Sequence, residues 1–199
     1  MPRASVAELR RGEIVDGAIR LIARAGYEAT TMRGLAAELD VSTGTITHWF
    51  ATKDHVLGAT LEELAARFAT RMEAELAGAD GPRAELIAIG DASVPDTQER
   101  VAEQRVWGEL AARAARTPAL AELHGRLYAG WRRRMERAVQ AGATRGELRA
   151  VDAADWARTY AALLDGLGLH ALLHPASITP ARMRAAIRAH VDGTLAPGA

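Results

Sequence analysis

Residues 35–50 (LAAELDVSTGTITHWF) hold the side chains whose types and spacing best suit contact with a partner molecule. The second half of this stretch predicts a short helix whose outer side carries small or hydrogen-bonding residues: Thr43, Gly44, Thr45, Thr47 and His48. Such groups can enter the major groove of DNA and reach base edges and phosphate oxygens. Because Gly44 has no side chain, the backbone can come closest there. The sequence therefore predicts hydrogen-bonded contact with DNA.

Two short helices joined by a tight turn must position these groups, and the same stretch supplies both. Its apolar residues are spaced to face inward and to fix the angle between the helices: Leu35, Ala36, Leu39, Val41, Ile46 and Phe50. Asp40 suits the turn, because aspartate tolerates left-handed backbone better than most residues. This is the helix-turn-helix plan. A generic helical hairpin with a solvated, threonine-rich outer face is the alternative that spacing alone leaves open.

The residues on either side of the two helices extend the predicted contact surface. Thr30 and Thr31 can cap the first of the helices. Lys53, the single lysine of the chain, stands at the start of the following helix. Its ammonium group and the positive end of the helix dipole both favour a phosphate at that place.

Composition predicts an all-α protein and excludes several functional classes. Ala, Leu, Arg and Glu dominate, whereas β-branched and aromatic residues are few. The formal net charge is zero, so the prediction of DNA binding depends on pattern and not on a basic surplus. The chain lacks cysteine, a phosphate-binding glycine loop and the HExxH and GxSxG motifs, so we expect no enzyme, no cofactor and no metal site. Without a signal-like segment or an apolar run of about 20 residues, we expect a soluble cytoplasmic protein with no membrane partner.

Helical spacing and helix-breaking residues predict nine helices. The expected ranges are 7–25, 32–39, 43–50, 53–77, 82–92, 96–116, 118–142, 152–174 and 180 to just before Pro197. The GADGP segment at residues 78–82 is the strongest internal breaker. The predicted division is a helix-turn-helix domain over residues 1–52 and a second helical domain over residues 53–199.

The span from about residue 10 to residue 64 resembles the DNA-binding domain of the tetracycline-repressor (TetR) family. The matching residues are Gly26-Tyr27, Thr30-Thr31, the string from Val41 to Phe50, Lys53-Asp54 and Val56-Leu57. Within that family, the Ser-Thr-Gly start of the recognition helix is most similar to the betaine-regulator branch, which residues 105–135 and 163–173 resemble more loosely. The resemblance implies a nine-helix fold and a repressor that a small-molecule effector releases from its operator. Residues 53–199 would then bind the effector and form the dimer, and a constitutive helical DNA-binding protein without an effector is the alternative.

The resemblance also implies which residues contact DNA. They are Thr31, Thr43, Gly44, Thr45, Thr47, His48 and Lys53. Thr31 would cap the second helix beside a phosphate, and Lys53 would hold another phosphate. The sequence departs from the family at two positions. Thr47 stands where tyrosine is common, which puts one phosphate contact in doubt, and Asp40 replaces the usual turn glycine at little cost.

An effector cavity among the C-terminal helices is a further implication of the resemblance. Its candidate lining residues are Trp107, Tyr128, Trp131, Tyr160 and Asp165. Aromatic walls with one carboxylate suit an organic cation. The alternative is that these large aromatic residues fill the core of a helical bundle, since core residues show the same helical spacing.

Two apolar helices near the C-terminus are predicted to hold a homodimer together, so that two copies contact a palindromic operator. The predicted interface residues are Leu163, Gly166, Leu169, His170, Leu173, Met183, Ile187 and Val191. Glycines such as Gly166 and Gly168 cost a helix ~1 kcal/mol each relative to alanine, and close approach of a second helix is one reason for them. A substrate channel or a local kink is the alternative. Two such helices from each copy would form an intersubunit four-helix bundle.

Overall fold

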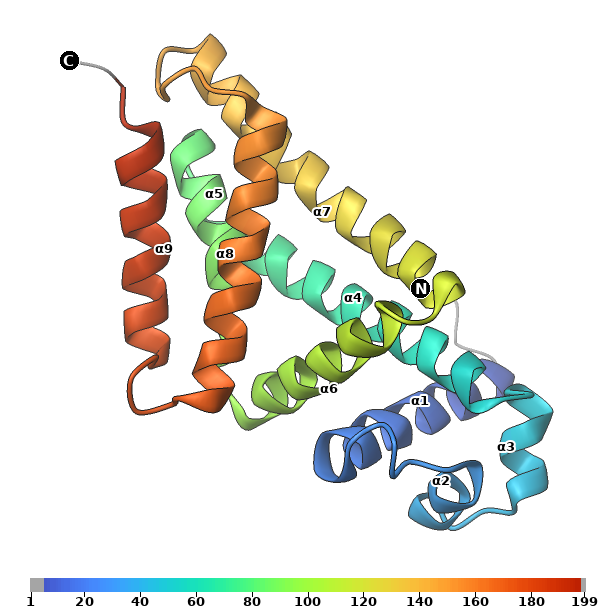
Figure 1. Cartoon of the computed structure of the whole chain (residues 1–199). Helices are drawn as coiled ribbons and strands as arrows, with labels where there is room; N and C mark the ends of the chain where they lie inside the picture. The colour runs from blue at the N-terminus through green and yellow to red at the C-terminus, as the bar shows by residue number, and fades with distance from the viewer. Residues whose placement is uncertain (1–5, 198–199) are drawn as a thin grey trace. The chain divides into compact units, whose positions relative to one another are not determined.

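The computed structural model describes residues 6–197, with side chains from residue 10 onward. Within residues 6–197 the chain forms nine α-helices and no strand, which confirms the all-α prediction (Figure 1). The helices are α1 (Val6–Ala25), α2 (Met32–Glu38), α3 (Thr43–Trp49), α4 (Lys53–Leu76), α5 (Gly81–Asp91), α6 (Gln98–Ala114), α7 (Pro118–Thr144), α8 (Ala153–Leu173) and α9 (Pro180–Leu195). Among these described helices, none is long and apolar enough to cross a membrane. The outer ends of the two predicted domains, residues 1–5 and 198–199, lie outside the described residues.

Side-chain oxygens cap the starts of several helices by accepting hydrogen bonds from backbone amides. The capping residues of α2, α3, α8 and α9 are Thr31, Ser42, Asp152 and Thr179. Helix α6 begins two residues later than predicted, because Thr97 Oγ1 accepts the hydrogen bond from the Arg100 amide at 3.2 Å. Asp96, at which the predicted range begins, instead forms ion pairs with Arg100 and Arg184.

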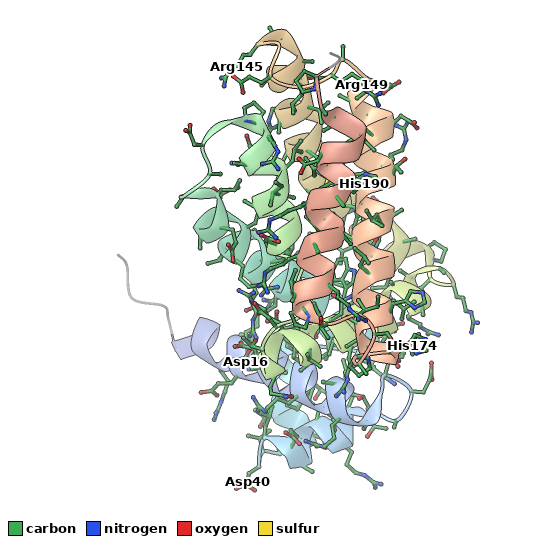
Figure 2. All side chains as sticks on the ribbon, turned by 90° about the vertical axis from the view of Figure 1, so that its left-hand side faces the viewer. Asp16, Asp40, Arg145, Arg149, His174 and His190 are labelled. Carbon is green, nitrogen blue, oxygen red and sulfur yellow. The ribbon has the colours of Figure 1, made fainter. Side chains whose placement is uncertain are left out.

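The turn between α2 and α3 has the geometry that Asp40 predicts. Asp40 has a φ of 52°, in the left-handed region, and lies at the tip of this turn (Figure 2). The next residue, Val41, donates its backbone hydrogen bond to Ala36 O at 3.0 Å. The turn therefore closes without a glycine.

The described chain forms two compact units, and each has its own core. The first comprises residues 6–65 and 102–124, and the second comprises residues 66–101 and 125–197. Helices α4, α6 and α7 each contribute residues to both units. In the first unit, α2 packs against α1 and α3. This structural division does not coincide with the predicted functional division at residue 53, because the start of α4 and most of α6 belong to the first unit.

The core of the second unit corrects part of the predicted dimer interface. Helix α9 packs against both α5 and α8 (Figure 1). Its apolar stripe faces this core, so that Met183, Ile187 and Val191 are only 0%, 0% and 1% exposed. Side chains without accessible surface cannot be buried again by a second copy. The prediction that these three residues form the dimer interface is therefore wrong.

Close packing inside the second unit explains a glycine in the middle of this core. A Cβ added at Gly90 would meet the Tyr160 hydroxyl and would lie 2.7 Å from Ile187 Cγ2. The Tyr160 hydroxyl is itself held in place, because it donates a hydrogen bond to Leu86 O at 3.1 Å. The helices can approach this closely only because residue 90 has no side chain.

We therefore expect Gly90→Ala to lower the free energy of unfolding by about 1–3 kcal/mol through overpacking. Gly108→Ala is the matched control, because Gly108 is exposed on α6 and an added Cβ there meets nothing within 4 Å. Because alanine favours a helix more than glycine does, the free energy of unfolding of this control should equal that of the wild type or exceed it by up to about 1 kcal/mol. Urea unfolding followed by circular dichroism measures both. Equal stabilities of the two variants would contradict the close packing.

Candidate functional site

Helix α3 presents its polar residues outward because its apolar residues are held inward. Ile46 and Phe50 are buried, and α3 packs on α2. Ser42 Oγ accepts a hydrogen bond from Thr45 N at 3.1 Å and lies 3.0 Å from Thr45 Oγ1. The structure therefore brings the predicted α3 residues together: Thr43, Gly44, Thr47 and His48 are exposed, and Thr45 is half-buried.

The threonine hydroxyls of this face differ in what they can still offer to DNA. Thr47 Oγ1 donates to Gly44 O at 3.2 Å. A hydroxyl has one hydrogen to donate, so in this rotamer Thr47 can accept a hydrogen bond or present its methyl group, but cannot donate to a phosphate. Thr31 Oγ1 accepts from Gly34 N at 2.9 Å, which leaves its own hydrogen available for a phosphate oxygen.

Lys53 occupies the predicted position at the start of α4, but its ammonium group already has partners. Nζ lies 3.8 Å from the centroid of the Tyr27 ring and 3.4 Å from Glu28 O. Burial lowers the pKa of Lys53. An ammonium group has three hydrogens, so these two contacts leave one for a phosphate.

The arginines of α1 are paired with acids, so their positive charges are offset locally. Arg20 and Arg24 both pair with Glu38, at 3.5 and 2.7 Å. Hydrogen bonding to Arg24 holds the pKa of Glu38 below its usual value. On the same helix, Arg10 pairs with Glu13 and Arg11 pairs with Glu62.

Arg33 is a candidate that the sequence analysis missed. It is exposed on the first turn of α2, two residues after Thr31, and has no ion-pair partner among the described side chains. Its place beside Thr31, at the start of a helix where the dipole favours an anion, could have indicated a phosphate contact from the sequence.

The second unit brings three of the five predicted effector residues together. The Tyr128 hydroxyl lies 2.5 Å from both carboxylate oxygens of Asp165 and donates its single hydrogen to that carboxylate. Burial raises the pKa of Asp165, and the Tyr128 hydrogen bond opposes that rise. The Trp131 ring meets Tyr128 edge-on at 5.3 Å, and its indole Nε1 is buried without a hydrogen-bond partner. Phe68 of α4, which the sequence analysis missed, meets Trp131 at 5.5 Å.

Tyr160 does not belong to this group, because it lies in the core of the second unit. It is 0% exposed, stacks on His190 at 5.4 Å and contacts Trp156 at 4.7 Å. His190 is seen on α9 beside α8 (Figure 2). Burial raises the pKa of Tyr160. Tyr160 thus fills the bundle core, which is the alternative that periodicity left open.

Trp107 belongs to the first unit. Its half-buried ring faces His124 of α7 at 5.3 Å between centroids.

The outer face of α8 keeps the other predicted interface residues accessible. Leu169 and Leu173 are 49% and 59% exposed and are the large apolar side chains that stay exposed within residues 10–197. Beside them, His170 is exposed and a Cβ added at Gly166 would meet nothing within 4 Å, whereas Leu163 packs partly against the core. The rings of His170 and His174 stack at 5.6 Å, and no group of three potential metal ligands is found among the described residues.

Comparison with known proteins agrees with this arrangement over most of the chain. Residues 14–60 match the family described as bacterial regulatory proteins, tetR family, and residues 82–196 match the BetI-type transcriptional repressor C-terminal family. The chain is 31% identical over 209 residues to the HTH-type transcriptional regulator BetI of Burkholderia mallei, with 99% of each chain covered. It is 30% identical to BetI of Burkholderia thailandensis, with 87% of each covered.

Solved structures share the fold as well. A transcriptional regulator from Saccharomonospora viridis, crystallised in complex with choline, superposes with a TM-score of 0.87 at 27% identity, covering 96% of this chain and 98% of that one. A transcriptional regulator from Rhodococcus sp. Rha1 gives a TM-score of 0.83 at 25% identity, covering 92% and 94%. With a helix-turn-helix at one end and a BetI-type helical region at the other, this chain belongs to the TetR family of transcriptional regulators and is not an enzyme.

Proposed function

We propose that this regulator is a cytoplasmic, dimeric repressor that binds a palindromic operator and leaves it when an organic cation binds in the second unit. The observation that carries the proposal is the cluster of Phe68, Tyr128, Trp131 and Asp165. We call these four residues the aromatic–carboxylate cluster. The related regulator from Saccharomonospora viridis, crystallised with choline, supports a cation of this kind.

The chemistry of the cluster favours a quaternary ammonium group over a neutral ligand. Such a group has no N–H to donate, so its recognition depends on aromatic faces and on a nearby negative charge. Tyr128 and Trp131 supply the rings, and the half-buried carboxylate of Asp165 supplies the charge. A bound cation favours the ionised carboxylate, so it would offset the burial that raises the pKa of Asp165.

We expect Asp165→Asn to weaken choline binding at least tenfold, a loss of about 1.4 kcal/mol. Asp155→Asn is the matched control, because it removes the same charge from an exposed position on the same helix. For the wild type, affinity should fall as the pH falls through the raised pKa of Asp165, since the protonated carboxyl no longer attracts a cation. This pH dependence should be missing in Asp165→Asn. Isothermal calorimetry measures the choline affinity of the wild type and of both variants over a range of pH.

Equal choline affinity of Asp165→Asn and the wild type would remove Asp165 from the site. Operator binding that no organic cation weakens would favour the alternative, a constitutive DNA-binding protein without an effector.

The exposed face of α3 and its surroundings are the proposed operator contacts. Thr43, Gly44 and Thr45 would face base edges at the start of the helix, with Thr47 and His48 beside them. Phosphate contacts are proposed for the flanking residues, Thr31, Arg33 and Lys53. In a dimer, the two copies of α3 would occupy successive major grooves about 34 Å apart.

Lys53→Ala should weaken binding to all DNA sequences alike and reduce the slope of log affinity against log salt by about one unit. Arg145→Ala, which removes an exposed arginine of the second unit, should leave that slope unchanged. Thr45→Ala should instead change the preference at one base position. Fluorescence anisotropy over a series of salt concentrations distinguishes them. A changed base preference with an unchanged slope in Lys53→Ala would show that Lys53 does not contact a phosphate.

The dimer interface that we propose is the outer face of α8, without the α9 stripe. Leu163, Gly166, Leu169, His170 and Leu173 would meet the same residues of a second copy around a two-fold axis. Two large exposed leucines on one helix face support this choice, because isolated proteins rarely expose such residues side by side.

Leu169→Arg would place a charge in that face, and we expect a folded monomer or an aggregate that no longer binds the operator. Ala150→Arg is the control, because Ala150 is exposed in the connection between α7 and α8. It should stay dimeric. Analytical ultracentrifugation together with circular dichroism reads both outcomes. A helical, monodisperse dimer of Leu169→Arg would move the interface to another surface.

A further inference from the structure

Tyr27, in the connection between α1 and α2, is only 5% exposed and has an unusual number of charged neighbours. The Lys53 ammonium lies 3.8 Å from the centre of its ring, and the guanidinium carbon of Arg113 lies 5.4 Å from it. The Tyr27 hydroxyl donates to Asp54 Oδ1 at 2.8 Å, and the Tyr27 backbone amide donates to Glu109 Oε2 at 3.3 Å. All five residues belong to the first unit.

These contacts fix the ring in one place. Burial and the hydrogen bond to Asp54 raise the pKa of Tyr27 to about 12, so the phenol stays protonated and remains a donor. Glu109 and Arg113 are four residues apart on α6, which places them on one face, one turn apart. Helix α6 therefore holds both the backbone and the ring of Tyr27.

The ring in turn limits where the lysine can go. A free lysine side chain samples many rotamers, and ordering it on DNA costs conformational entropy. Contact with the ring face and with Glu28 O restricts Lys53 before any DNA is present. A preorganised cation loses less entropy when it meets a phosphate.

We propose that Tyr27 is a positioning residue for Lys53, and that α6 sets the position of Tyr27 through Glu109 and Arg113. The inference depends on the phosphate contact proposed for Lys53. Through Tyr27 and Lys53, α6 would affect DNA affinity although it lies outside the helix-turn-helix.

A double-mutant cycle on operator affinity tests the proposal, with a genomic DNA fragment that the protein retains as the probe. Tyr27→Leu removes the aromatic ring and should lower affinity at 0.1 M salt by up to about tenfold, the most that the loss of one phosphate contact would cost. In the Lys53→Ala background the same substitution should change affinity less than about twofold, because the residue it positions is gone. Tyr27→Phe keeps the ring and should retain the salt slope of the wild type.

The α6 side of the proposal has its own variants. Arg113→Ala should lower affinity in the wild-type background and have no effect in the Lys53→Ala background. Arg105→Ala is the matched control, because Arg105 is exposed on the same helix. It should leave affinity unchanged in both backgrounds.

The thermal unfolding temperature of every variant shows whether a loss of affinity comes from unfolding or from a misplaced Lys53. Equal losses of affinity with and without Lys53, for Tyr27→Leu or for Arg113→Ala, would overturn the proposal, because each residue would then act on the fold and not through Lys53. An unchanged salt slope in Lys53→Ala would also overturn it. That last result would leave the cation response intact, since choline binding to the second unit tests it separately.

Discussion

Seven residues are too few for a helix to be stable in water, because nucleation costs more than so few hydrogen bonds return. Helix α3 exists because Ile46 and Phe50 are buried against their neighbours and because Ser42 caps its first turn. The same burial decides the outer face, since a helix that hides one side must show the other. The polar face that we propose for DNA contact thus depends on the apolar contacts beneath it, and neither can be altered alone.

Much of this arrangement could be predicted because its signals are local. Capping residues, proline starts and the left-handed Asp40 act within a few residues of themselves, and the helix bounds follow them closely. Periodicity is weaker evidence, because it identifies an apolar face without saying what covers that face. The stripe on α9 is covered by α5 and α8 of the same chain, and Tyr160 is covered by Trp156 and His190. Helical spacing alone therefore predicts the α9 stripe as a dimer contact and Tyr160 as an effector contact.

Contacts between residues far apart in the chain account for what the sequence could not predict. Lys53 meets a ring 26 positions earlier, and Phe68 joins Trp131 from another helix. The aromatic–carboxylate cluster also holds polar groups in a costly state: a half-buried carboxyl with a raised pKa and an indole N–H without a partner. Such groups are more common at binding sites than in cores built only for stability.

The ion pairs of α1 affect how this regulator finds its operator. Arginines that are already paired with Glu13, Glu38 and Glu62 should displace fewer condensed counterions from DNA than unpaired arginines would. Attraction to random genomic sequence should then be modest, and residence on wrong sites brief. The regulator would then search for its operator by repeated dissociation and rebinding more than by sliding along the DNA. Recognition would therefore depend on the few contacts made by α3 and its flanking residues. A repressor with that balance loses little time on competing DNA after its ligand leaves, and it can return quickly to its target.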